Sequence, residues 1–137
     1  MAIDNVIIDT NAYAAFKKGQ NEAVEIVKSL DRIILNPIVV GELISGFVIG
    51  TKEEQNRKEL IDFLEFPNVA LLEISQQTSE YFAQIYKELR TKGRPIPTND
   101  MWFASTAKEY ELGIFTYDSH FRELDNLTII SKLSDLP

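Results

Sequence analysis

Four acidic residues of this sequence stand apart from its other charged residues. Asp9 ends the apolar run VIID, Glu42 lies inside the stretch PIVVGELISGFVIG, Asp100 precedes MWFASTA, and Asp118 follows IFTY. Most of the remaining carboxylates sit among other charged residues, as on solvated helix faces. If the four converge, their mutual repulsion makes a hard divalent cation with oxygen ligands the natural partner. The pattern therefore predicts a Mg²⁺ or Mn²⁺ site.

Most of these carboxylates also have a purely structural interpretation. Asp9 and Asp118 could cap the helices that follow them, and Asp100 in a first helical turn would favour the helix dipole by about 0.3 to 1 kcal/mol. Capping does not account for Glu42, which lies in a helix that is apolar nearly all round and should therefore be buried. A carboxylate buried there needs a cation, a metal or a wet cavity, unless it points out through a polar gap or pairs with a distant lysine.

Short β-like runs alternate with helical patterns, which predicts an α/β fold with a largely parallel sheet. In such sheets the ligand crevice lies at the carboxyl ends of the strands, where Asp9 and Asp118 both leave a strand. The helix that Asp100 opens could begin at the same edge. Strands are expected at 5–9, 32–35, 68–74, 114–117 and 127–130, and helices at 10–19, 21–30, 36–50, 51–66, 75–93, 99–113 and 119–124.

Two local signals set expected helix starts. Asn36 precedes a proline at the first helical position, which makes it the expected N-cap of the helix that carries Glu42. Thr51 and Glu54 have the spacing of a capping box, which predicts that the next helix begins there.

Length and composition exclude several classes of protein. The 137 residues suit a single domain, 1–137, and 45% hydrophobic with 26% charged residues is ordinary globular composition. Because there is no cysteine and one histidine, disulfides, thiolate zinc sites, thiol nucleophiles and di-histidine metal sites are excluded. No glycine-rich phosphate loop is present, and neither an export signal nor a membrane-spanning stretch is evident. We expect a cytoplasmic protein whose acidic site performs metal-assisted hydrolysis.

The net charge of −7 makes a general attraction to nucleic acid unfavourable, so any contact with it must be local. One candidate is the segment 87–94, which could grip a phosphate backbone through four cations: Lys87, Arg90, Lys92 and Arg94. The alternative is a solvated helix end whose cations suit the helix dipole. Lys17 and Lys18 form a second small cluster with the same two interpretations.

The sequence resembles the PIN domain, and within it the VapC-type toxins of bacterial and archaeal toxin–antitoxin pairs. The matching stretches are IIDTNAY, PIVVGELISG, YKELRTKGRPIPTNDMWFASTA and IFTYDSHF, in that order over nearly the whole chain. The resemblance implies a compact three-layer α/β/α sandwich with a central, mostly parallel sheet. It also implies a Mg²⁺ or Mn²⁺ site of acidic residues that cleaves RNA endonucleolytically, with a metal-bound water as nucleophile.

The family's acidic positions fall on the four residues that already stood apart. The resemblance implies that Asp9 and Asp100 are the principal metal ligands and that Asp118 and Glu42 complete the ring, although Glu42 could instead orient the attacking water. Two polar residues match the family's support positions, Asn11 and Thr116. His120 lies where some relatives carry another acid, and packing or hydrogen bonding on its short helix is the favoured interpretation.

The toxin resemblance further implies a homodimer and a small antitoxin that blocks the acidic pocket. Some apolar residues of 36–50 could face a partner, although the core is the favoured place for most of them: Ile44, Phe47, Val48 and Ile49. Two alternatives stay open. One is a non-catalytic PIN-like module that binds RNA or protein, and the other is a metal-dependent phosphoesterase that acts on a small or DNA substrate.

Overall fold

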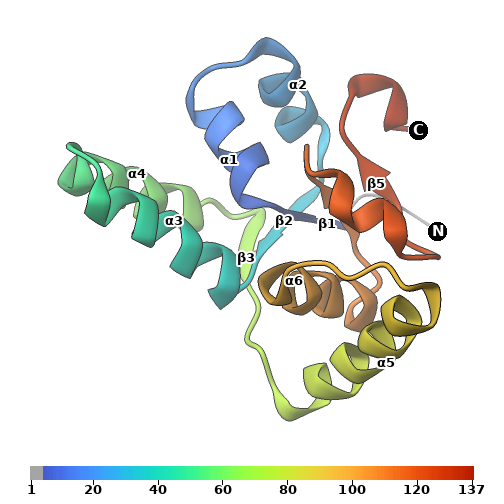
Figure 1. Ribbon diagram of the computed structural model, residues 1–137. Helices are drawn as coiled ribbons and strands as arrows, with labels where there is room; N and C mark the ends of the chain where they lie inside the picture. Colours follow the sequence, from blue (N-terminus) through green and yellow to red (C-terminus); the bar gives the residue numbers. More distant parts are fainter. Residues whose placement is uncertain (1–4) are drawn as a thin grey trace.

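A parallel sheet of five strands organises the computed structural model, which describes residues 5–137 (Figure 1). Its order is β3-β2-β1-β4-β5, and each neighbouring pair of strands is parallel. The chain therefore builds one half of the sheet outward from β1 and then crosses to build the other half. The strands are β1 (Asn5–Ile8), β2 (Arg32–Leu35), β3 (Val69–Leu71), β4 (Gly113–Phe115) and β5 (Ile129–Ile130).

The central strands owe their position to continuous apolar runs. Val6, Ile7 and Ile8 of β1 are fully buried, so this strand does not alternate between a core face and a solvent face. Ile7 pairs with Ile34 of β2 and Ile114 of β4. A parallel strand that is covered on both faces carries this kind of sequence, because helices pack on both sides of it.

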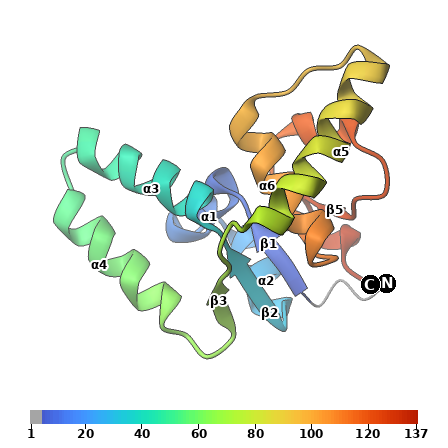
Figure 2. The same cartoon turned by 90° about the horizontal axis from the view of Figure 1, so that it is seen from below.

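Six α-helices surround the sheet. Figure 1 shows α1 and α2 over one face and α5 and α6 over the other, while α3 and α4 form a pair that projects to one side, as Figure 2 also shows. The expected three-layer α/β/α architecture is confirmed. The helices are α1 (Thr10–Lys17), α2 (Asn21–Ser29), α3 (Pro37–Ile49), α4 (Glu53–Leu64), α5 (Gln76–Lys92) and α6 (Thr98–Glu109), with two 3₁₀ helices, η1 (Ser119–Glu123) and η2 (Leu133–Asp135).

The two predicted helix starts have different outcomes. The Asn36 cap is confirmed, because its Oδ1 accepts a hydrogen bond from the Val39 backbone N–H at 3.0 Å. The capping box from Thr51 is wrong. Since α3 runs to Ile49, Thr51 is used in the turn that reverses the chain, and α4 begins at Glu53 without a side-chain cap.

The expectation that α3 is buried is also wrong. Only Val39 and Leu43 of this helix are buried, whereas Val48 is 52% exposed and Ile49 88%. The reason is position: α3 lies beside the sheet and packs on α1, α4 and α6, so much of its apolar surface has no neighbour. Among residues 5–137, no helix combines the length and apolarity needed to cross a bilayer.

Candidate functional site

The predicted acidic residues lie at the edge of the sheet where β1 and β4 end. The strand order changes direction between these two neighbours, so the segments that leave them diverge and a crevice can form between them. Asp9 directly follows β1, and Asp118 follows β4 by three residues. Helices α3 and α6 contact each other and bring Glu42 and Asp100 to the same region.

Asp9 is held by three hydrogen bonds and is only 5% exposed. Its Oδ1 accepts from the Thr10 backbone N–H at 2.8 Å, so it does cap α1. Its Oδ2 accepts from the Thr116 hydroxyl at 2.8 Å and from the Asn11 side-chain amide at 3.3 Å. An ionised carboxylate has about four acceptor sites, so capping leaves Asp9 able to accept a further ligand.

Burial raises the pKa of Asp9 from 3.8 to about 6. The hydrogen bonds from Thr116 and Thr10 offset part of this effect, and the negative charges of Asp100 and Glu42 add to it. Three carboxylates from distant parts of the chain therefore act on one another. Such a group favours the approach of a cation, because a cation relieves both the desolvation and the repulsion.

Asn11 and Thr116 tie the segment after β4 to Asp9. The Asn11 Oδ1 accepts from the Tyr117 backbone N–H at 2.9 Å, and the Thr116 hydroxyl oxygen accepts from the Asp118 backbone N–H at 3.0 Å. Thr116 is 1% exposed, so its hydroxyl is oriented by these two partners rather than by solvent. Both side chains hold a carboxylate or its backbone in place, as expected of supporting groups.

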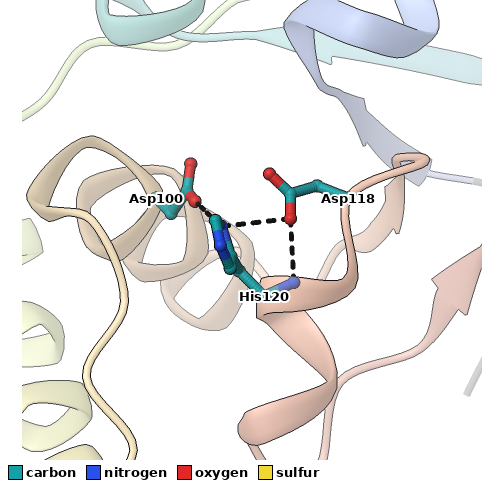
Figure 3. Close-up of side chains that lie close together, drawn as sticks. All are labelled: Asp100, Asp118 and His120. Carbon is teal, nitrogen blue, oxygen red and sulfur yellow. Dashed lines mark hydrogen bonds and ion pairs between the residues drawn. The ribbon is translucent and has the colours of Figure 1, made fainter.

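His120 lies between Asp100 and Asp118 (Figure 3). Its Nδ1 is 2.8 Å from Asp100 Oδ2 and 3.0 Å from Asp118 Oδ1. Asp118 Oδ1 also accepts from the His120 backbone N–H at 2.9 Å and so caps η1. The histidine was expected to pack or to form hydrogen bonds on its own short helix, and the structure shows that it also reaches Asp100 on α6.

The pKa values of Asp100 and His120 are both shifted in this cluster. Burial raises the pKa of Asp100, the charge of Asp118 adds to the rise, and the hydrogen bond with His120 partly reverses it. The hydrogen bond with Asp100 raises the pKa of His120. Each of the three residues offers one ligand atom, and these atoms lie within 4.8 Å of one another. Two carboxylate oxygens and an imidazole nitrogen form a donor set that fits a divalent cation.

Glu42 faces a hollow instead of a dry core. Its Oε1 accepts from the Thr10 hydroxyl at 3.2 Å, and its half-buried side chain lines an open hollow of about 530 Å³ together with Ser45 and Asn99. No lysine or arginine within residues 5–137 lies within 4.0 Å of this carboxylate. Of the alternatives open at the sequence level, the structure thus favours a carboxylate that points out through a polar gap beside Ser45, next to the acidic group.

Sequence reasoning missed two residues that connect the site. Thr10 links the Glu42 side chain to the segment of Asp9, and its place directly after Asp9 was the available signal. Asn36 was expected only as a cap. Its Nδ2 also donates to the Thr106 hydroxyl at 3.0 Å and so joins the start of α3 to α6. Nothing in the sequence indicated this contact between residues seventy positions apart.

The basic segment 87–94 is partly neutralised within the protein. Lys92 Nζ lies 2.8 Å from Glu88 Oε2 and 3.0 Å from Asp125 Oδ1, and Arg94 lies 3.8 Å from Glu123. Lys87 and Arg90 are exposed and form no ion pair with the residues of 5–137. Nucleic-acid binding by this segment stays a prediction, and two of its four cations are free for it.

Comparisons with known proteins give matches that span most of the chain. Residues 6–127 match the family model of the PIN domain. The chain is 28% identical over 128 residues to Ribonuclease VapC2 of Rickettsia felis, a match that covers 90% of this chain and 94% of the relative. It is also 28% identical over 126 residues to Ribonuclease VapC1 of Haemophilus influenzae, covering 88% and 92% respectively.

Solved structures give the same result. The fold is similar to a chain of VapBC2 from Rickettsia felis bound to a DNA fragment from their promoter, with a TM-score of 0.81, 26% identity, and 92% of this chain and 97% of that chain covered. It is similar to a chain of VapBC-1 from nontypeable Haemophilus influenzae with a TM-score of 0.80 and 25% identity, covering 93% and 97% respectively.

Proposed function

The chain belongs to the PIN domain family, and from this premise we propose that it is a divalent-metal-dependent endoribonuclease, the toxin of a toxin–antitoxin pair. Its similarity to VapC ribonucleases over nearly their whole length supports this activity. The resemblance to PIN domains that the sequence motifs indicated is confirmed by the family match. RNA phosphodiester bonds are the proposed substrate.

One observation carries the proposal: an unbroken series of contacts joins carboxylates from four separate segments of the chain. Thr10 links Glu42 to Asp9, Thr116 links Asp9 to the backbone of Asp118, and His120 links Asp118 to Asp100. Capping accounts for Asp9 and Asp118 singly, but it gives no reason for all four to gather at the β1/β4 edge. Metal-assisted hydrolysis gives that reason.

The proposed roles are those that the resemblance to PIN domains implies, and the contacts of the side chains support them. Asp9, Asp100 and Asp118 would hold the cation, which we take to be Mg²⁺ or Mn²⁺. When bound, it would neutralise charge on the scissile phosphate and make a water more acidic. Glu42, which faces the open hollow, would complete the ring or orient that water. Asn11 and Thr116 would keep the Asp9 carboxylate in one orientation.

The expected partners and location belong to the same proposal. Lys87 and Arg90 are the cations of 87–94 that have no ion pair within residues 5–137, so they are the ones proposed to contact the RNA backbone. The solved relatives are VapBC complexes, which supports a cognate antitoxin here, and Val48 and Ile49 offer exposed apolar surface for it or for a second copy in a homodimer. The cytoplasm is the proposed location.

The test is cleavage of total RNA with Mg²⁺ and, separately, with EDTA. We expect the parent protein to cleave only when the cation is present. The Asp100→Asn variant should lose roughly 100-fold or more of this activity, because one charge of the cation site is gone. Asp31→Asn is the matched control, since it removes an exposed carboxylate between α2 and β2, at the opposite end of the strands.

If Asp100→Asn cleaves RNA like the parent in matched Mg²⁺, the proposed site is wrong. RNA binding that survives EDTA, with no cleavage when the cation is restored, would instead assign the chain to the non-catalytic PIN-like modules.

A further inference from the structure

A second pocket, of about 450 Å³, lies between α1, α3 and α4, and three lysines line it. Lys17 and Lys18 come from the end of α1, and Lys52 directly precedes α4. None of the three has a carboxylate within 4.0 Å among residues 5–137, and Glu59 is the one acidic side chain in the lining. On a protein with a net charge of −7, the pocket is therefore a local positive region.

The wall of the pocket contains a polar group without a partner. Tyr13 lines the pocket and is 3% exposed, and its hydroxyl makes no hydrogen bond. Among residues 5–137 it is the only buried side-chain nitrogen or oxygen of which this is true. Its ring packs edge-on against Phe63 with ring centroids 5.2 Å apart, so the hydroxyl is held in its place. Buried polar groups in proteins are normally paired, so the wall of the pocket holds one hydrogen-bonding group that the protein itself does not use.

Three further lining residues suit a nucleobase. Phe47 is half-buried and offers an aromatic side chain, while Gln55 and Asn56 offer amide donors and acceptors. Proteins that bind single-stranded RNA stack bases on aromatic rings and read base edges with polar side chains, while lysines contact the phosphates. The pocket holds all three kinds of group.

The pocket also lies close to the acidic site along α1. Ala14 lines the pocket four residues after Thr10, whose hydroxyl donates to Glu42, so these two side chains lie on one face of the helix. At about 1.5 Å of rise per residue, this separation corresponds to about 6 Å along the helix. One RNA strand can therefore pass from the carboxylates into the pocket.

We propose that this pocket is a nucleotide subsite for single-stranded RNA, next to the point of cleavage. Lys17 and Lys52 hold backbone phosphates, while Phe47 and the two amides contact one base. This inference rests on the proposed ribonuclease function, since the strand that enters the pocket is the substrate. An acidic protein segment would need only the lysines of the pocket as partners. The additional aromatic ring and two side-chain amides can contact a base, and they therefore favour RNA.

The experiment measures RNA binding without cleavage. Fluorescence anisotropy follows a labelled 20-nucleotide RNA of random sequence, and every variant is made in the Asp100→Asn background so that the RNA stays intact. The test variant combines Lys17→Gln with Lys52→Gln. The matched control combines Lys28→Gln with Arg32→Gln, which removes two exposed positive charges at the opposite end of the strands.

We expect Kd to rise about tenfold in the test variant at about 0.1 M salt. The slope of log Kd against log salt concentration should fall by about 1.4, because two phosphate contacts at about 0.7 each are lost. The control variant should keep both values. Circular dichroism checks that all variants are folded, which is expected because Lys17 and Lys52 are exposed and Lys52 forms no side-chain cap.

Two results would overturn the subsite. One is an unchanged Kd and salt slope in the test variant. The other is competition by a 20-residue polyglutamate peptide as strong as competition by unlabelled RNA, which would identify a surface for acidic proteins. Cleavage by the parent protein separates these failures from failure of the proposed function: a parent that cleaves RNA while the test variant binds RNA normally contradicts only the subsite.

Discussion

Helices α3 and α6 each bring one carboxylate to the proposed site, but the protein holds them in opposite ways. Helix α6 carries serine and threonine residues and still buries six of its side chains: Met101, Phe103, Ala104, Ser105, Thr106 and Ala107. Helix α3 is far more apolar and buries only Val39 and Leu43. Hydrophobic sequence alone therefore does not determine burial in this protein.

The difference comes from where each helix lies. Helix α6 packs between the sheet and α5 (Figure 1). Its polar groups are satisfied inside; the Ser105 hydroxyl, for example, donates to the Met101 carbonyl at 2.6 Å. Helix α3 leaves the carboxyl end of β2 and extends beside the sheet. Asp100 thus stands on a fixed support, while Glu42 stands on a helix anchored mainly at its start.

The largest expected effect tests this contrast directly. Phe103→Ala on α6 should lower the free energy of unfolding by about 3 to 5 kcal/mol, because it empties a fully packed core position. Ile49→Ala on α3 should change it by less than about 0.5 kcal/mol, since that side chain is 88% exposed. Urea denaturation measures both values. Equal losses in the two variants would show that α3 is buried in solution, for instance against a second copy of the chain.

A smaller effect concerns the pKa of Asp9, which is raised by the charges of Asp100 on α6 and Glu42 on α3. The metal-free folded protein holds a proton on Asp9 up to about pH 6, whereas the unfolded chain releases it near 3.8. The folded state binds more protons between these values, so the free energy of unfolding should fall as pH rises from about 4 to 6, by up to about 3 kcal/mol. Chemical denaturation in EDTA across this range measures the fall.

The two helices should contribute unequally to that fall. Asp100 raises the pKa of Asp9 more than Glu42 does, so Asp100→Asn should flatten the pH dependence more than Glu42→Gln. Asp9→Asn provides the reference curve, in which this contribution is absent. A steeper fall in Asp100→Asn than in the parent would contradict the proposed arrangement of charges.

The smallest expected effect concerns the link between the helices. Asn36→Ala removes the cap of α3 and leaves the Thr106 hydroxyl without its side-chain donor, so it should lower the free energy of unfolding by about 2 kcal/mol. Because α6 is held by the core, RNA cleavage should suffer through Glu42 rather than through Asp100. Amide hydrogen exchange should therefore become faster in α3 and stay unchanged in α6. Faster exchange in α6 with unchanged exchange in α3 would contradict the view that α6 is held by the core and α3 mainly by its start.

The sequence was sufficient for the architecture because strand and helix periods, together with proline and glycine positions, are local properties. It predicted each strand, each α-helix and the 3₁₀ helix η1 but not η2, and it also predicted that Asp9 and Asp118 leave strands at one edge. The sequence was not sufficient to predict that α3 is largely exposed, because the burial of this helix depends on where β2 ends in the sheet. It also missed that His120 reaches Asp100, because residues on different elements meet only through the tertiary fold.

The order of the strands has a consequence for the synthesis of the protein. Strand β4 pairs with β1 but is made more than one hundred residues later, and it delivers both the Thr116 hydroxyl and Asp118. Until that segment leaves the ribosome, Asp9 lacks its Thr116 donor and the remaining carboxylates have no common edge. A growing chain therefore lacks an assembled acidic site, and the four carboxylates share one edge only when the segment from β4 onward closes the sheet.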